Sequence, residues 1–551
     1  MDVPALDHPA TIPALLHHAA TRFGDRDFVV MADRRLTYAQ AEAASRRVAK
    51  ELLAAGIGKG TRVAMLDTFS TEWVVFWLAA TRIGAIFVPL ASTMKPPEAR
   101  WTLRHSDVHL MVVPPTVLGA DMYDFVAAAV PGLADAGPAP LYLAEHPYLR
   151  EIRSTAPGGP VWAGELSCAT EASSSAAGSA GPVDDHFLEQ VEQQVSPSDA
   201  MVIVYTSGST SEPKAVVHTH GGLVRHGANL LLHASPGPNP EERCFTGLPF
   251  FWVGGLSHGL LRAMHGGTAM LCMERFEPGA ALDLLEREHA TRFVGWAPMH
   301  DAVKTHPTFA SRDLSRVPDL TGANPPPGSP LYHNSLGMTE TGGPHTACPP
   351  ELYGHQVPVA LQGSFGFPLP YVAHRVVDPD TGEVLPEGEH GELCVRGYNL
   401  MDAMYKRERH EVFDDDGWYH TNDGGFFREG CFIFTGRLGE MIKTAGANVS
   451  PREVEVVLED LPGVELAQVV GLPDEERGEI VAAVLVAEPG HDLDVSSVVG
   501  ELHERIASYK VPRRVAVVTR DDIPWLATTQ VDRRELARRF AAGELPGAGC
   551  R

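Results

Sequence analysis

"YTSGSTSEPKAVVHTH", residues 205–220, begins at the end of an apolar run and is crowded with hydroxyl groups. Six of the seven residues from Thr206 to Glu212 are glycine or carry a hydroxyl, and Lys214 follows Pro213. The apolar run predicts a buried strand, and open α/β sheets commonly bind ligands at the carboxyl ends of their strands. Backbone N–H groups, hydroxyls and a lysine at that place favour a bound polyphosphate.

The loop differs from a Walker A sequence, because GxxxxGK[ST] is absent and the lysine follows proline rather than glycine. An ordinary surface loop rich in serine and glycine is the simplest alternative to a polyphosphate site. The local sequence leaves both interpretations open, so the choice between them depends on what accompanies the loop elsewhere in the chain.

Composition indicates a folded globular protein with more than one domain. The chain has 551 residues, of which 44% are hydrophobic and 21% are charged. The 45 basic and 70 acidic residues give a net charge of -25, which repels nucleic acids and anionic membranes at long range. We therefore expect a small-molecule substrate and no nucleic-acid partner.

Cysteine spacing and apolar segments favour a reduced, cytoplasmic protein. The seven cysteines are scattered without CxxC spacing, which indicates neither a disulfide framework nor a zinc site. The N-terminus lacks a basic region followed by an apolar core, so we expect no secretory signal. The longest apolar run, residues 73–90, contains Arg82 and Gly84 and predicts a buried helix, a turn and a strand rather than a membrane span.

Helix and strand signals alternate along the chain. Residues 12–23 carry apolar side chains at helical spacing after Thr11, a candidate N-cap. Thr37 and Gln40 form a candidate capping box for the next helix, and Gly56 is its candidate C-terminal stop. Short apolar runs such as RVAML and MVIVY lie between such helices. This alternation predicts an α/β fold with a predominantly parallel sheet covered by helices.

Further motifs accompany the loop in a fixed order. They are LTYAQAEAASRRVAKELLAAGIGKGTRVAML (36–66), NSLGMTET (334–341), GELCVRG (391–397), YHTNDGGFF (419–427), GRLGEMIKTAGANVSPREVE (436–455) and SYKVPRR (508–514). In this combination the chain resembles the adenylate-forming superfamily, which comprises acyl-CoA synthetases, luciferases and the adenylation domains of peptide synthetases. So many ordered motifs make a chance coincidence negligible.

The resemblance implies the domain organisation. A large N-terminal AMP-binding domain with mostly parallel sheets would span residues 1–438, and a small mobile α+β domain would span residues 439–551. The hinge would lie near Glu440. In the superfamily the small domain rotates between adenylation and transfer of the activated acid to a thiol.

The resemblance also implies an ATP site with Mg²⁺. The loop and Lys214 would hold the β- and γ-phosphates, Thr339 would contact the α-phosphate, and Glu340 would help hold Mg²⁺. Asp423 would accept both ribose hydroxyls, with Arg437 beside it. The remaining residues assigned to the nucleotide are Thr206, Ser207, Gly208, Ser209, Thr210, Leu336 and Gly337.

The resemblance also assigns residues to the binding of the acid and of the acceptor. Gly446 would let the pantetheine arm of CoA pass close to the backbone, and Lys443 would lie near the incoming thiol. Trp252, Gly254 and Gly255 would line the tunnel for the acid. At Trp252 the superfamily often has histidine, so the gate to this tunnel is bulkier and not basic.

The chain departs from the superfamily at the position of its catalytic lysine. IPWLATTQVDRREL, residues 523–536, aligns with Pro-x-Thr-x-Thr-Gly-Lys-x-x-Arg, which places Thr529 at the glycine and Gln530 at the lysine. Losing one preorganised donor to developing charge commonly lowers a rate by about 100- to 1,000-fold. We expect slow adenylation, help from another cation, or an unusual substrate.

Smaller departures surround the nucleotide site. Leu336 replaces an aromatic residue that stacks on adenine, and Asn422 replaces the glycine before Asp423. Ser211 and Ala215 replace glycines of the phosphate loop. The segment between TGAN and NSLG is also short, which favours a compact pocket for the acid.

Four functions are compatible with these residues. The first is an acyl-CoA synthetase-like ligase that activates a small carboxylate as acyl-AMP, releases pyrophosphate, and transfers the acyl group to CoA or another acceptor. The second is a diazotase that activates nitrite for attack by an arylamine. A non-catalytic ATP-binding homologue and a serine hydrolase are remote alternatives, the latter because GLSHG, residues 255–259, matches GxSxG.

Overall fold

The structure is a computed structural model. It describes residues 3–169, 182–206, 213–234, 239, 241–295, 297–321, 335–349, 361, 364–444, 447–474, 477–506, 508–526, 530–545 and 549–550. The chain forms two compact units. Unit 1 comprises Met1–Val357, Phe365–Ala373 and Arg396–Tyr419, and unit 2 comprises Pro358–Ser364, His374–Val395 and His420–Arg551. The predicted division after Leu438, which concerns domain movement rather than packing, stays a prediction.

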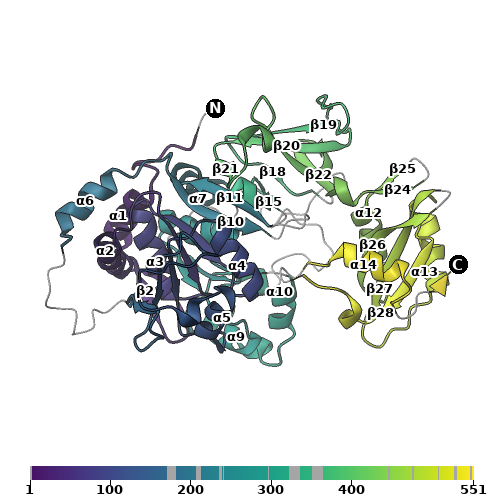
Figure 1. The fold of residues 1–551 in the computed structure, drawn as a ribbon. Helices are drawn as coiled ribbons and strands as arrows, with labels where there is room; N and C mark the ends of the chain where they lie inside the picture. Colours follow the sequence, from purple (N-terminus) through teal and green to yellow (C-terminus); the bar gives the residue numbers. More distant parts are fainter. Residues whose placement is uncertain are drawn as a thin grey trace. The chain divides into compact units, whose positions relative to one another are not determined.

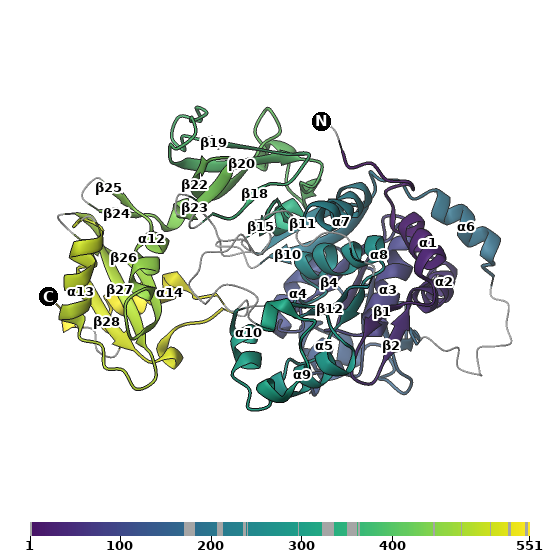
Figure 2. The same cartoon turned by 180° about the vertical axis from the view of Figure 1, so that it is seen from behind.

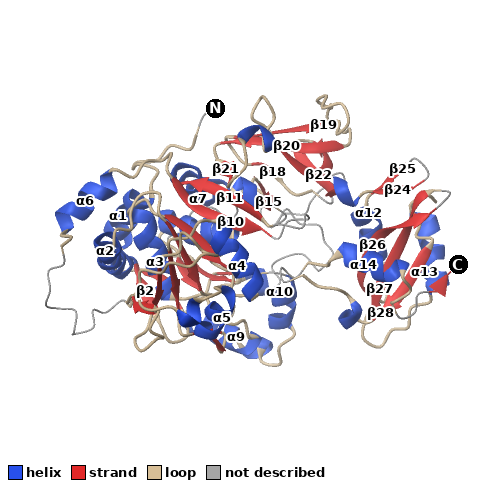
Figure 3. Ribbon diagram, in the orientation of Figure 1, coloured by secondary structure: helices blue, strands red, loops and turns tan. Residues whose placement is uncertain are grey.

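An eight-stranded sheet forms the centre of unit 1 (Figure 3). In spatial order its strands are β21 (Ala403–Met404), β11 (Lys214–Thr219), β10 (Ala200–Thr206), β4 (Ile86–Leu90), β3 (Arg62–Leu66), β5 (Leu110–Val113), β8 (Glu151–Ser154) and β9 (Ala163–Glu165). From β10 to β9 neighbouring strands are parallel, whereas β11 is antiparallel to both β10 and β21. The predicted strands RVAML and MVIVY are therefore confirmed, as is the mostly parallel α/β fold.

Both faces of this sheet are buried. Successive strand residues point to opposite faces. In β3, Val63 and Met65 join the core that contains α1, α2 and α3, whereas Ala64 and Leu66 join the core that contains α4 and α5. Burial on both faces explains why these strands are almost continuously apolar.

Helices cover these faces, and α1, α2 and α3 lie side by side in both views (Figures 1 and 2). The helices of unit 1 are α1 (Ile12–Phe23), α2 (Tyr38–Ala54), α3 (Thr71–Arg82), α4 (Pro96–His105), α5 (Met122–Ala129), α6 (Asp185–Gln193), α7 (His220–His233), α8 (Arg262–Gly266), α9 (Pro278–Arg287), α10 (Ala297–Lys304) and α11 (Pro318–Thr321). None of the helices in the described ranges is long and apolar enough to cross a membrane.

The predicted helix signals are confirmed with one correction. Thr37 and Gln40 form both hydrogen bonds of a capping box at the start of α2, and Gly56 lies just beyond its end with φ at 79°. Thr11 occupies the cap position of α1, but its side chain makes no capping hydrogen bond. Instead the Ile12 N–H donates to Nδ1 of His220, 3.2 Å away, so a distant buried imidazole caps this helix.

The apolar run at residues 73–90 forms α3, a turn and β4, as predicted. Gly84 forms the turn with φ at 74°, a conformation that favours glycine. Arg82 is buried in this run because its guanidinium pairs with Glu42 at 3.0 Å and with Glu192 at 2.5 Å. A buried charge is tolerated when it is paired and hydrogen-bonded in this way.

A second sheet in unit 1 has five strands, and short strand pairs complete the unit. In spatial order the sheet contains β14 (Arg292–Val294), β12 (Arg243–Thr246), β13 (Ala269–Leu271), β1 (Asp27–Val30) and β2 (Arg35–Thr37). The short pairs are β6 (Thr116–Val117) with β7 (Ala120–Asp121), β15 (Gly337–Met338) with β16 (Gly343–Pro344), and β17 (Thr346–Ala347) with β18 (Phe367–Pro368).

Two sheets contribute to unit 2. The four-stranded sheet has the order β19 (Val372–Val377), β20 (Gly391–Gly397), β22 (Tyr419–Arg428) and β23 (Cys431–Arg437). The six-stranded sheet has β25 (Ala447–Val449), β24 (Ile442–Thr444), β27 (Gly478–Ala487), β28 (Arg514–Val518) and β29 (Gly549–Cys550), with β26 (Val464–Asp474) also paired to β27. Cores on its two faces contain α12 (Pro451–Glu459) with α13 (Val495–Arg505), and α14 (Arg533–Ala541), respectively. This α+β composition agrees with the fold predicted for the C-terminal part.

Candidate active site

The two ends of the predicted phosphate loop lie opposite each other. Thr206 ends β10 and Lys214 begins β11, and these two residues are paired across the antiparallel strands. The loop residues Ser207, Gly208, Ser209 and Thr210, together with Ser211, lie outside the described residues. The strand pair thus places the lysine at the mouth of the hairpin that carries the hydroxyl-rich loop.

Lys214 meets the carboxylate of Glu340. Its Nζ lies 3.5 Å from Oε1 of Glu340, and the hydroxyl of Tyr419 donates to the same oxygen at 2.9 Å. Glu340 is only 8% exposed, and its carbonyl accepts from the N–H of Met401 at 2.8 Å. A buried carboxylate is thereby held beside Lys214, with its second oxygen, Oε2, in neither contact.

Thr339 is positioned by a buried histidine. Nε2 of His218 is 2.7 Å from the carbonyl oxygen of Thr339, to which a neutral imidazole donates. Burial lowers the pKa of His218 to about 4, so the ring is neutral near pH 7. Sequence reasoning missed both His218 and Tyr419, although each stands inside a motif that was singled out, VVHTH and YHTND.

Leu336 and Gly337 precede Thr339 and Glu340 in the chain, and Gly337 begins the short hairpin of β15 and β16. The N–H of Leu336 donates to Oγ1 of Thr346 at 2.8 Å, and its side chain is half-buried. A Cβ atom on Gly337 would lie 2.7 Å from the backbone of Gly343 and Pro344, so only glycine fits between β15 and β16. Leu336, which stands where the superfamily has an aromatic residue, therefore lies next to a closely packed stretch of backbone.

Asp423 and Arg437 are paired across β22 and β23. Nε of Arg437 lies 2.9 Å from Oδ1 of Asp423, and its NH1 donates to the carbonyl of Thr421 at 2.9 Å. Asp423 is 1% exposed, whereas the side chain of Arg437 is 49% exposed. This arrangement holds a buried carboxylate in one orientation.

The backbone conformation of Asn422 explains why asparagine can stand where the superfamily has glycine. Its φ is 58°, in the left-handed region that asparagine tolerates better than most residues. Asparagine therefore preserves the left-handed backbone conformation next to Asp423 within β22.

This conformation leads to a stability prediction. Asn422→Val is expected to lower the free energy of unfolding by about 1–3 kcal/mol, because a β-branched residue is strained at positive φ. Asn422→Gly is the matched control and is expected to stay within about 1 kcal/mol of wild type. Urea denaturation followed by circular dichroism measures both, and equal losses in the two variants would contradict the conformational explanation.

The predicted tunnel segment is helical rather than a nucleophile elbow. Residues Gly255–Leu261 form a π-helix, and a Cβ on Gly255 would lie 2.1 Å from the carbonyl oxygen of Pro249. Trp252 is half-buried and makes an edge contact with Phe251. Ser257 is fully buried and donates to the carbonyl of Val253 at 2.8 Å. The strand–serine–helix turn of a hydrolase is absent at this serine, so the hydrolase alternative has no structural basis here.

The remaining predicted residues belong to unit 2. Lys443 is exposed on β24, and its N–H donates to Oε2 of Glu479 at 2.7 Å. Gln530 is also exposed, and its carbonyl accepts from the N–H of Leu526 at 2.8 Å. Gly446 and Thr529 lie outside the described residues. Gln530 is thus held by its backbone, with its side chain at the surface of the unit.

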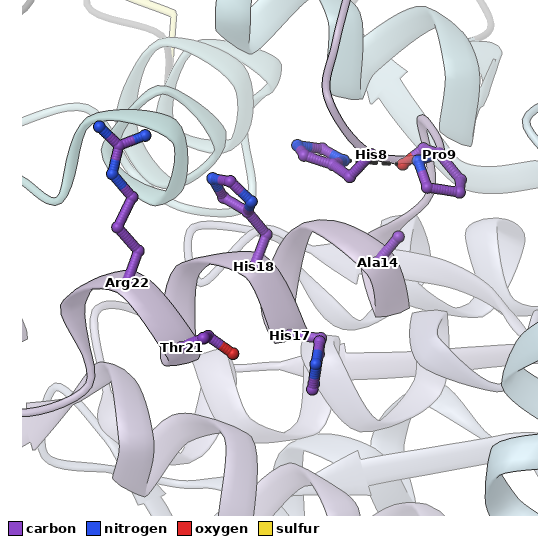
Figure 4. Close-up of a pocket in the computed structure, with 7 residues that line it drawn as sticks. All are labelled: His8, Pro9, Ala14, His17, His18, Thr21 and Arg22. Atoms are coloured by element: carbon purple, nitrogen blue, oxygen red, sulfur yellow. Dashed lines mark hydrogen bonds between the residues drawn. The ribbon is translucent and has the colours of Figure 1, made fainter.

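A cavity of about 380 Å³ lies at the N-terminal end of unit 1 (Figure 4). Figure 4 shows α1 contributing most of its lining, while two of the residues precede that helix. The lining residues are His8, Pro9, Ala14, His17, His18, Thr21 and Arg22. None of them is a predicted site residue, so this cavity is separate from the predicted chemistry.

Comparison with known proteins identifies the family. Residues 16–405 match AMP-binding enzymes, and residues 453–527 match the C-terminal domain of AMP-binding enzymes. The chain belongs to the AMP-binding enzyme family. Its adenylate-forming, acyl-CoA ligase-like character follows from this match and from its relatives, and the resemblance found in the sequence is confirmed.

The relatives of this AMP-binding enzyme span nearly its whole length. YngI, a putative acyl-CoA synthetase of Bacillus subtilis (strain 168), is 30% identical over 548 residues, covering 96% of this chain and 97% of that protein. A feruloyl-CoA synthase of an Amycolatopsis species is 31% identical over 512 residues, covering 92% and 94%. The structure of an amide bond synthetase mutant from Marinactinospora thermotolerans is 25% identical, with a TM-score of 0.77 and coverage of 96% and 99%. These similarities confirm the predicted fold.

Proposed function

We propose that this AMP-binding enzyme activates a small carboxylate with ATP, forms an acyl-AMP with release of pyrophosphate, and transfers the acyl group to CoA. The observation that carries the proposal is the buried Glu340 carboxylate, held by Lys214 and Tyr419 where β11 leaves the phosphate loop. Family membership and the relatives support the same chemistry.

In the proposed adenylation step, a carboxylate oxygen attacks the α-phosphorus of ATP, and the bond to the pyrophosphate oxygen breaks. The loop residues and Lys214 neutralise the β- and γ-phosphates, and Thr339 contacts the α-phosphate. The positive charge of Lys214 matters because negative charge accumulates on the departing pyrophosphate. His218 fixes the backbone of Thr339 through its carbonyl and so acts as a positioning residue.

Mg²⁺ fits the residues beside the loop. It prefers oxygen ligands and usually binds through one or two carboxylates together with substrate phosphates. Glu340 supplies a buried carboxylate with Oε2 outside the contacts to Lys214 and Tyr419, and we propose it as the protein ligand. The ion, when bound, neutralises charge on the phosphates.

In the proposed transfer step, the thiol of CoA attacks the acyl carbonyl and AMP leaves with the former carboxylate oxygen. Lys443 and Gly446 are proposed to line the path of the thiol, and the division into residues 1–438 and 439–551 is proposed to allow it. Gln530 replaces the lysine of the first step. Adenylation is therefore expected to be the slower of the two reactions.

Asp423→Asn tests the proposed ribose contact. The variant keeps the size of the side chain but removes its charge, and hydrogen bonds to charged groups contribute about 1.5–3 kcal/mol. The Kd for ATP is expected to rise by at least about tenfold, measured by calorimetry with Mg²⁺ present. Asp415→Asn, at an exposed position, is the control, and an unchanged Kd in Asp423→Asn would remove this residue from the nucleotide site.

The function itself is tested with a substrate panel. The enzyme is incubated with ATP, Mg²⁺ and small aliphatic or aryl carboxylates, with and without CoA, because feruloyl-CoA synthase is among its relatives. The proposal expects AMP, pyrophosphate and an acyl-CoA with at least one acid. A parallel arm contains nitrite and arylamines, and turnover in that arm alone would replace the carboxylate proposal with the diazotase alternative. ATP binding without turnover in any arm would indicate a non-catalytic homologue.

A further inference from the structure

We propose that Glu392, Cys394 and His420 form a binding site for Zn²⁺ or a cation of similar softness, distinct from the proposed Mg²⁺ ligand. Their ligand atoms, one carboxylate oxygen, one sulfur and one ring nitrogen, all lie within 4.8 Å of one another. A carboxylate, a thiolate and an imidazole together are a donor set that Zn²⁺ accepts.

Strand geometry brings the three side chains together. Glu392 and Cys394 are two residues apart on β20, so they point to the same face of the sheet. His420 lies on the neighbouring strand β22, and its register is fixed by Oγ1 of Thr421, which donates to the carbonyl of Leu393 at 2.6 Å. The three side chains therefore belong to one sheet.

Both partners face the same ring nitrogen. Nδ1 of His420 is 2.7 Å from Oε2 of Glu392 and 3.5 Å from Sγ of Cys394. In a tetrahedral zinc site with bonds of about 2.3 Å to sulfur and about 2.0–2.1 Å to nitrogen, those two atoms lie roughly 3.5 Å apart. The oxygen and nitrogen of such a site lie roughly 3.3 Å apart, so the carboxylate oxygen must move away from the ring nitrogen by about half an ångström.

The surroundings support a carboxylate ready to bind a cation. Oε1 of Glu392 accepts from the N–H of Asn422 at 2.9 Å, which orients the group while Oε2 faces the ring. Glu392 and Cys394 are buried, whereas the side chain of His420 is 41% exposed and connects the site with solvent. Three protein ligands leave a fourth position for water, as in exchangeable zinc sites.

Cation binding displaces the proton of the Cys394 thiol, which passes to solvent as the sulfur binds as a thiolate. Nδ1 of His420 binds through its lone pair, with the ring proton on Nε2. Mg²⁺ is a poor substitute, because it prefers oxygen ligands.

The test uses the full-length, untagged enzyme in buffer without nucleotide. Co²⁺ serves as a spectroscopic probe through the thiolate-to-metal charge-transfer band, and Zn²⁺ affinity is measured by calorimetry. Cys394→Ser is expected to abolish the band. His420→Asn, at a partly exposed position, is expected to weaken Zn²⁺ binding by more than about tenfold, the loss often caused by removing even an outer partner of a metal site.

Cys431→Ser is the matched control, because Cys431 is a buried cysteine on β23 of the same sheet and lies outside the cluster. It is expected to keep the band and the wild-type affinity. Thermal melting without metal verifies that each variant is folded. If Cys394→Ser is not folded, the Zn²⁺ affinity of His420→Asn tests the proposed site. The proposal is overturned if the wild-type enzyme shows no thiolate band, if the band survives in Cys394→Ser, or if His420→Asn binds Zn²⁺ as tightly as wild type.

Discussion

Glu340→Gln is expected to lower the single-turnover rate of acyl-adenylate formation by about 100- to 1,000-fold. The amide keeps the shape of the side chain and its hydrogen bond from Tyr419, but it removes the negative charge that pairs with Lys214 and that is proposed to bind Mg²⁺. Charge stabilisation at the reacting phosphates is commonly the largest single contribution to such rates. Rapid-quench measurement of acyl-AMP at saturating ATP and Mg²⁺ provides the rate.

The effect is expected in the rate rather than in stability. Because the substitution preserves the size of the side chain and the hydrogen bond from Tyr419, we expect a smaller effect on thermal melting than on the rate. Glu189→Gln on α6 is the control, because the side chain of Glu189 is 52% exposed and the residue is not among those assigned to the site. A wild-type rate in Glu340→Gln would exclude this residue as the cation ligand and move that role elsewhere.

Gln530→Lys is expected to accelerate adenylation by at least about tenfold, which corresponds to about 1.4 kcal/mol of transition-state stabilisation. The lysine would restore a cation at the position where the superfamily places one between the carboxylate and the α-phosphate. Gln530 is exposed and held by its backbone carbonyl, so the substitution should leave the local fold intact. The measurement is single-turnover acyl-AMP formation across the carboxylate panel.

Two controls separate charge from other effects. Gln530→Met has a similar length without charge, and it is expected to be no faster than wild type. Thiolysis of preformed acyl-AMP by CoA should be unchanged in Gln530→Lys, because the proposed surface for that step contains Lys443 and Gly446. An unchanged or slower adenylation rate with every carboxylate would contradict the lost-cation explanation and favour an unconventional substrate.

Local signals predicted much of the fold because they depend on neighbouring residues. The capping box of Thr37 and Gln40 and the stop at Gly56 are such signals, and both are present in the structure. Thr11 was a sound candidate by the same rule, yet the cap of α1 comes from His220, which is 208 residues away. Tertiary contacts of this kind leave no local pattern.

The candidate site likewise combines signals that the sequence shows with tertiary contacts that it does not. Motif order pointed to Lys214 and Glu340, which the structure brings into contact, but no local pattern indicated the contact of Tyr419 with Glu340. Asn422 looked like a departure from the superfamily, whereas its positive φ explains why the residue is tolerated. Cysteine spacing likewise could not indicate the cluster around Cys394, because its ligands come from two adjacent strands.

The most direct test of the account follows the oxygen of the carboxylate. An acid that turns over is labelled with heavy oxygen in its carboxylate and incubated with the enzyme, ATP, Mg²⁺ and CoA, and the products are analysed by mass spectrometry. Attack of the carboxylate on the α-phosphorus, followed by thiolysis, predicts one labelled oxygen in AMP and none in pyrophosphate. Unlabelled AMP, or formation of ADP with the label in inorganic phosphate, would contradict an acyl-adenylate intermediate.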